Sequence, residues 1–199
     1  LNKKKQSYFI DLDLTENIFM DIINFRTNSK KISNVKSEFN INSNKYIFKY
    51  IELKEGKSSI FIEGLVLNNR GEIKEVKNIN LVTFNNRKEN NNLQIKFGKK
   101  ISIIGDKYDS TYLLKSLSRN NKPNPLKNFN KEVEIKLKNL ITKSKTPLNN
   151  FNLIGVIKRG QFNKISSKGE FSENQYLDIS LKKDPNNNKI LEIYSDLPQ

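Results

Sequence analysis

The feature that most constrains the fold of this chain is a period-two alternation of apolar and polar residues along most of its length. Residues 132–138 are the clearest case, because Val133, Ile135 and Leu137 alternate there with Glu and Lys. Successive side chains of a β-strand point to opposite faces of a sheet. The pattern therefore predicts a strand with one apolar face and one solvated face.

The same pattern recurs in segments of strand length that are separated by turns rich in Asn and Gly. Asn and Gly favour such turns because they tolerate positive φ. The predicted strands cover residues 39–41, 46–53, 59–67, 79–84, 93–97, 99–104, 132–138, 151–157, 161–165, 168–171, 176–181 and 189–194, with an Asn-rich loop over 85–92 and a turn over 184–188. Strands at this spacing predict an antiparallel β architecture.

Residues 99–117 interrupt the series with a strand, then Gly105, and then Asp109 ahead of a short helical pattern. Asp109 is expected to cap that helix, and Leu113 and Leu117 give it an apolar stripe at helical spacing. Residues 118–131 contain two prolines and mark the place where an internal break is expected. Near the N-terminus, residues 11–23 fit either a strand followed by a helical turn capped by Thr15, or two short strands.

Cysteine and histidine are both absent from the 199 residues. Their absence excludes disulfides, thiolate nucleophiles, imidazole bases and the usual zinc ligands. The carboxylate pairs Asp11/Asp13 and Glu132/Glu134 each lie on one strand face, where such groups solubilise a sheet more often than they catalyse hydrolysis. No phosphate-binding loop motif is present. The sequence therefore predicts a protein that is not an enzyme and that needs no metal and no cofactor.

The net charge of +15 raises the alternative of a basic β-domain that binds nucleic acid. Of the 36 basic residues only 5 are Arg, and the lysines are scattered over outward strand positions. Phosphate-clamping and base-reading surfaces favour Arg, whose guanidinium is bidentate. We therefore expect solvated strand faces and no nucleic-acid partner. A passive β-scaffold without a ligand is a further alternative.

Four phrases in order along the chain resemble the AsmA-like proteins of Gram-negative bacteria, in particular the C-terminal region of the YhdP-type members. They are Asp-Leu-Asp-Leu-Thr at 11–15, Ile-Phe-Ile-Glu-Gly at 60–64, the glycine–aspartate–helix pattern at 103–114, and the closing strands at 162–171, 177–181 and 189–196. Their order and spacing carry the resemblance more than any single phrase does. The abundance of Lys and Asn, and the proline-containing loop, depart from the family pattern.

The resemblance implies that the chain is one segment of a longer bridge protein, anchored in the inner membrane and extending through the periplasm. It implies an open, curved antiparallel sheet with one or two short helices, whose groove conducts phospholipids between the inner and outer membranes. The alternating residues are then expected to line the groove. These residues are Leu93, Ile95, Phe97, Ile101, Ile103, Val133, Ile135, Leu137, Leu153, Ile157, Leu177, Ile179 and Leu181.

Overall fold

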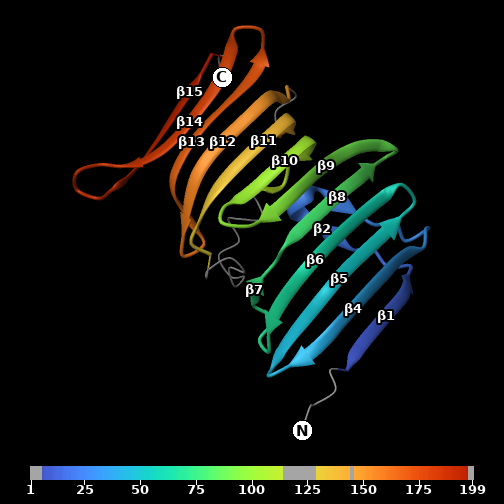
Figure 1. The fold of residues 1–199 in the computed structure, drawn as a ribbon. Helices are drawn as coiled ribbons and strands as arrows, with labels where there is room; N and C mark the ends of the chain where they lie inside the picture. Colours follow the sequence, from blue (N-terminus) through green and yellow to red (C-terminus); the bar gives the residue numbers. More distant parts are fainter. Residues whose placement is uncertain (1–5, 114–128, 144–145, 197–199) are drawn as a thin grey trace.

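The computed structural model describes residues 6–113, 129–143 and 146–196. Thirteen of their strands form one open, curved sheet, and two further short strands form a separate hairpin (Figure 1). The main path runs from the edge strand β1 to the edge strand β15, while the short strand β7 pairs only with β6. The predicted open, curved, mainly β architecture is confirmed.

The strands of the sheet are mostly 8 to 12 residues long. They are β1 (Ser7–Leu14), β4 (Ser33–Asn42), β5 (Lys45–Glu55), β6 (Ser58–Asn68), β7 (Ile73–Glu75), β8 (Asn78–Asn85), β9 (Lys88–Phe97), β10 (Ile101–Asp109), β11 (Lys131–Ile141), β12 (Leu148–Lys158), β13 (Gln161–Ser172), β14 (Gln175–Lys183) and β15 (Lys189–Ser195). The hairpin consists of β2 (Phe19–Met20) and β3 (Phe25–Arg26), which are joined through the 3-10 turn η1 (Asp21–Ile23).

Neighbouring strands of the sheet are antiparallel, with one exception. The strands β10 and β11 are parallel, and Ile103 is aligned with Ile135. A parallel pair needs a crossover connection rather than a hairpin. The chain between these two strands contains the predicted internal break at 118–131, of which residues 118–128 lie outside the described residues, and β11 begins at Lys131.

Two local predictions differ from the structure, and a third lies largely outside the described residues. The Asn-rich loop predicted over 85–92 is wrong, because β8 runs to Asn85 and β9 begins at Lys88. The two strands predicted over 161–165 and 168–171 form the single strand β13. The helix predicted after Asp109 lies largely outside the described residues, and Asp109 itself is the last residue of β10.

The N-terminal region combines features of both predicted alternatives. β1 forms as expected, but the helical turn is a single 3-10 turn that starts at Asp21 and has no side-chain cap. Asn24 ends this turn in the left-handed conformation, with φ of 44°. The chain therefore turns back on itself directly before Phe25.

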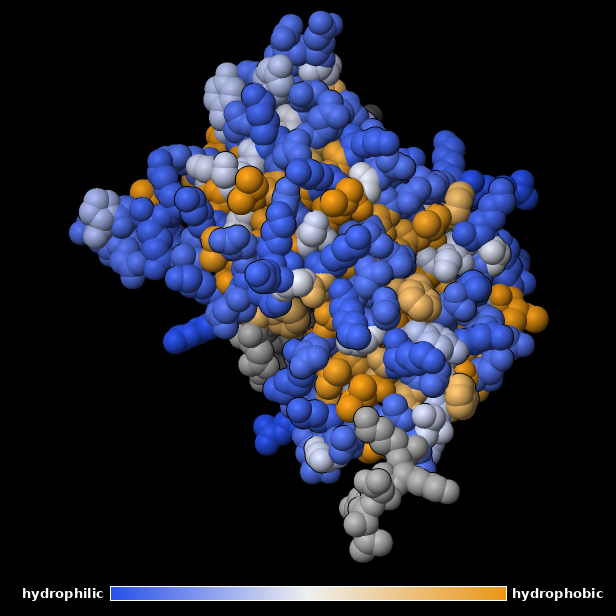
Figure 2. Space-filling model, viewed as in Figure 1, coloured by the Kyte–Doolittle hydropathy of each residue, from blue (hydrophilic) through white to orange (hydrophobic). Residues whose placement is uncertain are grey.

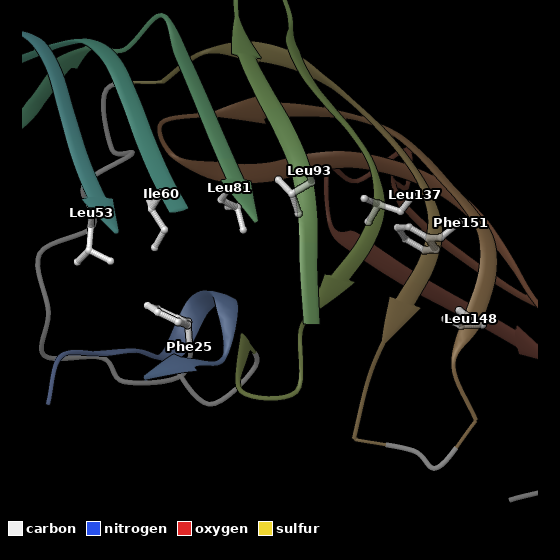
Figure 3. Packing of buried hydrophobic residues seen from close by; sticks show 8 residues of the cluster. All are labelled: Phe25, Leu53, Ile60, Leu81, Leu93, Leu137, Leu148 and Phe151. Carbon is white, nitrogen blue, oxygen red and sulfur yellow. The ribbon is translucent and has the colours of Figure 1, made fainter. Parts of the chain in front are cut away.

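Buried apolar side chains lie on one face of the sheet, which we call the inner face. Figure 3 shows the sheet arching over Phe25, with Leu53, Ile60, Leu81 and Leu93 directed toward it. A second buried cluster lies on the same face and includes Ile101, Val133 and Ile157 together with Phe129. The concave side of the sheet is therefore its apolar side.

Gly105 occupies an inner-face position between Leu93 and Leu137. A Cβ atom placed on Gly105 would lie 2.4 Å from the backbone oxygen of Asn92 and 2.4 Å from the Cβ of Leu93. A glycine inside a strand marks a place where another part of the chain approaches closely. The missing side chain at residue 105 therefore lets Asn92 and Leu93 of β9 approach β10 closely.

Candidate functional site

The inner face carries a continuous row of side chains that crosses the sheet from edge to edge. We call it the isoleucine row, because nine of its members are Ile. In sheet order the aligned residues are Ile10, Ser37, Ile51, Ile62, Ile79, Ile95, Ile103, Ile135, Leu153, Ser167, Ile179 and Ile193. Twelve strands at about 4.8 Å spacing give this row a length of about 50 Å.

A second row lies beside it and is more deeply buried. It contains Leu12, Val35, Leu53, Ile60, Leu81, Leu93, Gly105, Leu137 and Phe151. Leu81 is 4% exposed and Leu137 is 3% exposed, whereas Ile95 and Ile135 in the isoleucine row are half-buried. The second row therefore serves as core, and the isoleucine row is the part of the inner face that a ligand can contact.

The structure brings all thirteen residues predicted to line a groove onto this inner face. Five belong to the isoleucine row and two to the buried row. Phe97, Ile101, Val133 and Leu181 align in a third row, Ile157 packs in the second cluster, and Leu177 packs against the first. The prediction did not include the N-terminal half of the rows, such as Ile51, Ile62 and Ile79. The alternation in residues 46–53, 59–67 and 79–84 contained the signal for them.

The opposite, outer face is mostly polar. Asn80, Gln94, Lys136 and Asn152 lie in the row that backs the isoleucine row, with the exposed Ile104 among them. Figure 2, which views the sheet from the side away from the β2–β3 hairpin, shows mostly hydrophilic surface with scattered hydrophobic residues. The two faces of the sheet therefore differ sharply in chemistry.

The acidic pairs on the outer face are engaged by neighbouring side chains. Asn34 Nδ2 donates hydrogen bonds to Asp11 Oδ1 at 2.8 Å and to Asp13 Oδ1 at 2.9 Å. Glu134 forms ion pairs with Lys100 and Lys136, and their hydrogen bonds lower the pKa of its carboxyl group to about 2. Solvated, ion-paired carboxylates of this kind are typical of a sheet surface and do not form an acid–base pair.

The aromatic residues of the strands do not all lie on one face of the sheet. Phe48 and Phe97 lie on the inner face, because they are aligned with the buried Leu65 and Ile101. Phe61 is aligned with Glu52 and Asn80 on the outer face. Phe48, Phe61 and Phe97 therefore do not form a single platform.

Residues 17–28, which include the β2–β3 hairpin, close one end of the concave side, and we call them the plug. Phe25 of the plug is fully buried and packs against the inner-face cluster (Figure 3). Thr27 is also fully buried, and its Oγ1 accepts a hydrogen bond from the Ile18 amide at 2.6 Å and donates to the Glu16 carbonyl at 2.9 Å. Sequence patterning did not indicate the plug, because strands of two residues show no period.

A buried polar network joins the plug to the sheet. Asn91 Nδ2 donates to the Ile23 carbonyl at 2.6 Å and to Thr83 Oγ1 at 2.7 Å, while Asn91 Oδ1 accepts from the Asp109 amide at 2.8 Å. Asn24 Nδ2 donates to Asp109 Oδ2 at 2.8 Å. Buried polar groups with all partners present hold a single arrangement. The plug is therefore fixed in place by hydrogen bonds as well as by Phe25.

Asp109 makes the kind of hydrogen bond expected of a helix cap, although the helix predicted after it lies largely outside the described residues. Its Oδ1 accepts hydrogen bonds from the Thr111 amide at 3.1 Å and from Thr111 Oγ1 at 2.6 Å. An aspartate that binds the amide two residues ahead forms an Asx turn. Asp109 thus ends β10 and anchors the plug through its second oxygen.

Comparison of the chain with family models, with curated proteins and with solved structures found no match. Among the described residues, no group of three or more Asp and Glu side chains could hold a metal ion. None of the described helical residues belongs to a helix long and apolar enough to cross a membrane. The geometry of the sheet therefore carries the functional argument.

Proposed function

We propose that the inner face binds the acyl chains of phospholipids and that this chain is one segment of a bridge that conducts lipids. The observation that carries the proposal is the isoleucine row, which continues across all twelve strands of the sheet path. In the proposed setting the bridge spans the periplasm, is anchored in the inner membrane and delivers phospholipids toward the outer membrane.

The energetics of acyl chains call for such a surface. Moving hydrocarbon from a bilayer into water costs about 0.8 kcal/mol per CH₂, so two long acyl chains cost on the order of 20 kcal/mol. An apolar surface without gaps offsets this cost at every position that an acyl chain occupies as it moves along the sheet. The half-buried side chains of the isoleucine row supply contact area without breaks longer than one serine, at Ser37 and Ser167.

The two edges of the sheet support a longer path. Leu12 in β1 is 51% exposed, and Ile193 in β15 is 62% exposed, although both side chains belong to inner-face rows. In the described residues these edge strands each pair on one side only. Apolar rows that reach both open edges would continue into flanking strands of a larger sheet.

Two neighbouring isoleucines on opposite faces give a matched test. Ile103 belongs to the isoleucine row, whereas Ile104 is on the outer face and is 55% exposed. Ile103→Lys places a charge on the proposed path, and we expect at least a tenfold loss of affinity for a fluorescent phospholipid, measured by titration of the purified chain. Ile104→Lys should bind as the unchanged protein does.

Circular dichroism of both variants checks that each retains the β-sheet. Equal lipid affinities in the two folded variants would contradict the proposal, and so would the absence of saturable binding to the unchanged protein. The proposal needs no catalytic residue, because a lipid that slides along an apolar surface undergoes no covalent change.

A further inference from the structure

A hollow of about 1200 Å³ lies beside the plug, at the end of the sheet where two hairpin turns meet it. The turns are those between β5 and β6, with Gly56 and Lys57, and between β8 and β9, with Asn86 and Arg87. The plug contributes the opposite wall. Asp109 and Tyr112 complete the lining, so the hollow is built from four segments that lie far apart in the sequence.

Positive charge dominates this hollow. Arg26, Lys31, Lys57 and Arg87 line it, and in the described part of the chain none of the four forms an ion pair. Lysines elsewhere on the sheet do form ion pairs, as Lys138 does with Asp106 at 2.7 Å. Four cations without carboxylate partners around one concave surface favour an anion.

The two carboxylates in the hollow already have hydrogen-bond donors. Glu55 Oε2 accepts from the Asn28 amide at 2.8 Å and from Ser33 Oγ at 2.9 Å. Asp109 accepts from Asn24 and Thr111. Both carboxylates therefore hold the plug and its neighbouring segments together, and in the described residues they form no ion pair with the basic side chains. Arg26 lies over the ring of Phe19, with its Cζ 4.9 Å from the ring centroid.

The backbone at Arg87 provides an independent indication. Arg87 is the second residue of the two-residue turn after Asn86, and its φ is +65°. Glycine is preferred at this position, as in the turn Arg159–Gly160 of the same chain. A non-glycine residue in the left-handed region carries a conformational cost, and such costs concentrate at binding sites. The chain therefore has an arginine at a turn position where glycine would be more stable.

We propose that this hollow binds the phosphate group of an anionic ligand. Arg26 and Arg87 supply planar guanidinium groups that match phosphate oxygens in a bidentate way, and Lys31 and Lys57 add point charges. The proposal does not depend on lipid binding at the inner face, because its residues lie at the sheet end and its ligand is recognised by charge.

The test compares Arg87, in the turn between β8 and β9, with Arg70, in the turn after β6. Arg87 lines the hollow with Ser58, where β6 begins, whereas the exposed Arg70 follows Asn68, where β6 ends. Inorganic phosphate is titrated into the full chain and followed by calorimetry. We expect Arg87→Gln to weaken the phosphate affinity at least tenfold, and Arg70→Gln to leave it within a factor of two.

Arg87→Gly separates binding from folding. We expect this variant to lose phosphate affinity as Arg87→Gln does, while its thermal midpoint is equal to or above that of the unchanged protein, because glycine suits φ of +65°. A second titration, with soluble short-chain phosphatidic acid, shows whether the bound phosphate group belongs to a lipid headgroup or to a free phosphate. Tighter binding than that of inorganic phosphate indicates a lipid headgroup, and equal binding indicates a free phosphate. Indistinguishable affinities in Arg87→Gln and Arg70→Gln, or no saturable binding to the unchanged protein, would overturn the proposal.

Discussion

Replacing Gly105 by alanine is expected to destabilise the protein by about 1–3 kcal/mol, the usual cost of overpacking a core. The added Cβ would lie 2.4 Å from the Asn92 backbone oxygen, 2.4 Å from Leu93 Cβ and 2.7 Å from Leu93 Cα. No side-chain rotation removes these contacts, because two of the three atoms belong to the backbone. The strands β9 and β10 would have to move apart to make room for the added atom.

Urea denaturation of the two proteins measures this difference directly. Gly98→Ala is the matched control, since a Cβ at Gly98 finds its nearest neighbour 3.8 Å away. The account predicts a lower denaturation midpoint for Gly105→Ala alone. If both variants kept the midpoint of the unchanged protein, the close approach at residue 105 would not exclude a side chain there.

Truncation of Phe25 should have the larger effect. The Phe25 side chain of the plug is fully buried against the inner face, so Phe25→Ala removes an aromatic ring from a packed site. Substitutions of this kind typically cost about 3–5 kcal/mol. The plug should also become more accessible to limited proteolysis, because the contacts that remain are polar, as around Asn91, or come from partly buried side chains such as Ile18 and Ile23.

Phe9→Ala provides the comparison, because Phe9 in β1 is 72% exposed. We expect that variant to change the free energy of unfolding by less than 0.5 kcal/mol, as is usual for surface positions at about this exposure. A loss of less than about 1 kcal/mol in Phe25→Ala would show that the plug contributes little to the fold.

The strands were predictable because their alternation is a local property. Val133, Ile135 and Leu137 share a face in any strand, whatever the strand pairs with. Alignment between strands is not local. The sequence did not indicate that Ile135 aligns with Ile103 in a parallel pair, because antiparallel and parallel pairing place the same residues on the same face.

Asn90 and Asn91 show why the loop predicted from the Asn-rich composition of residues 85–92 was wrong. Asn is disfavoured in strands, so residues 85–92 were expected to form a loop. In the structure both asparagines lie within β9 and are buried, where Asn90 Oδ1 accepts a hydrogen bond from Thr83 and Asn91 contacts the plug. Hydrogen bonds to distant segments compensate for the low intrinsic preference, and no short window of the sequence contains those partners.

Photo-crosslinking from single positions on the two faces tests the central claim most directly. A photoreactive residue is placed at Ile95 or Ile135 on the inner face, and at Lys96 or Lys136, which follow them in the same strands and are exposed. After irradiation of cells that express the full chain, mass spectrometry identifies the attached molecules. The account predicts phospholipid adducts at Ile95 and Ile135 and none at Lys96 and Lys136. Equal labelling at all four positions would contradict it.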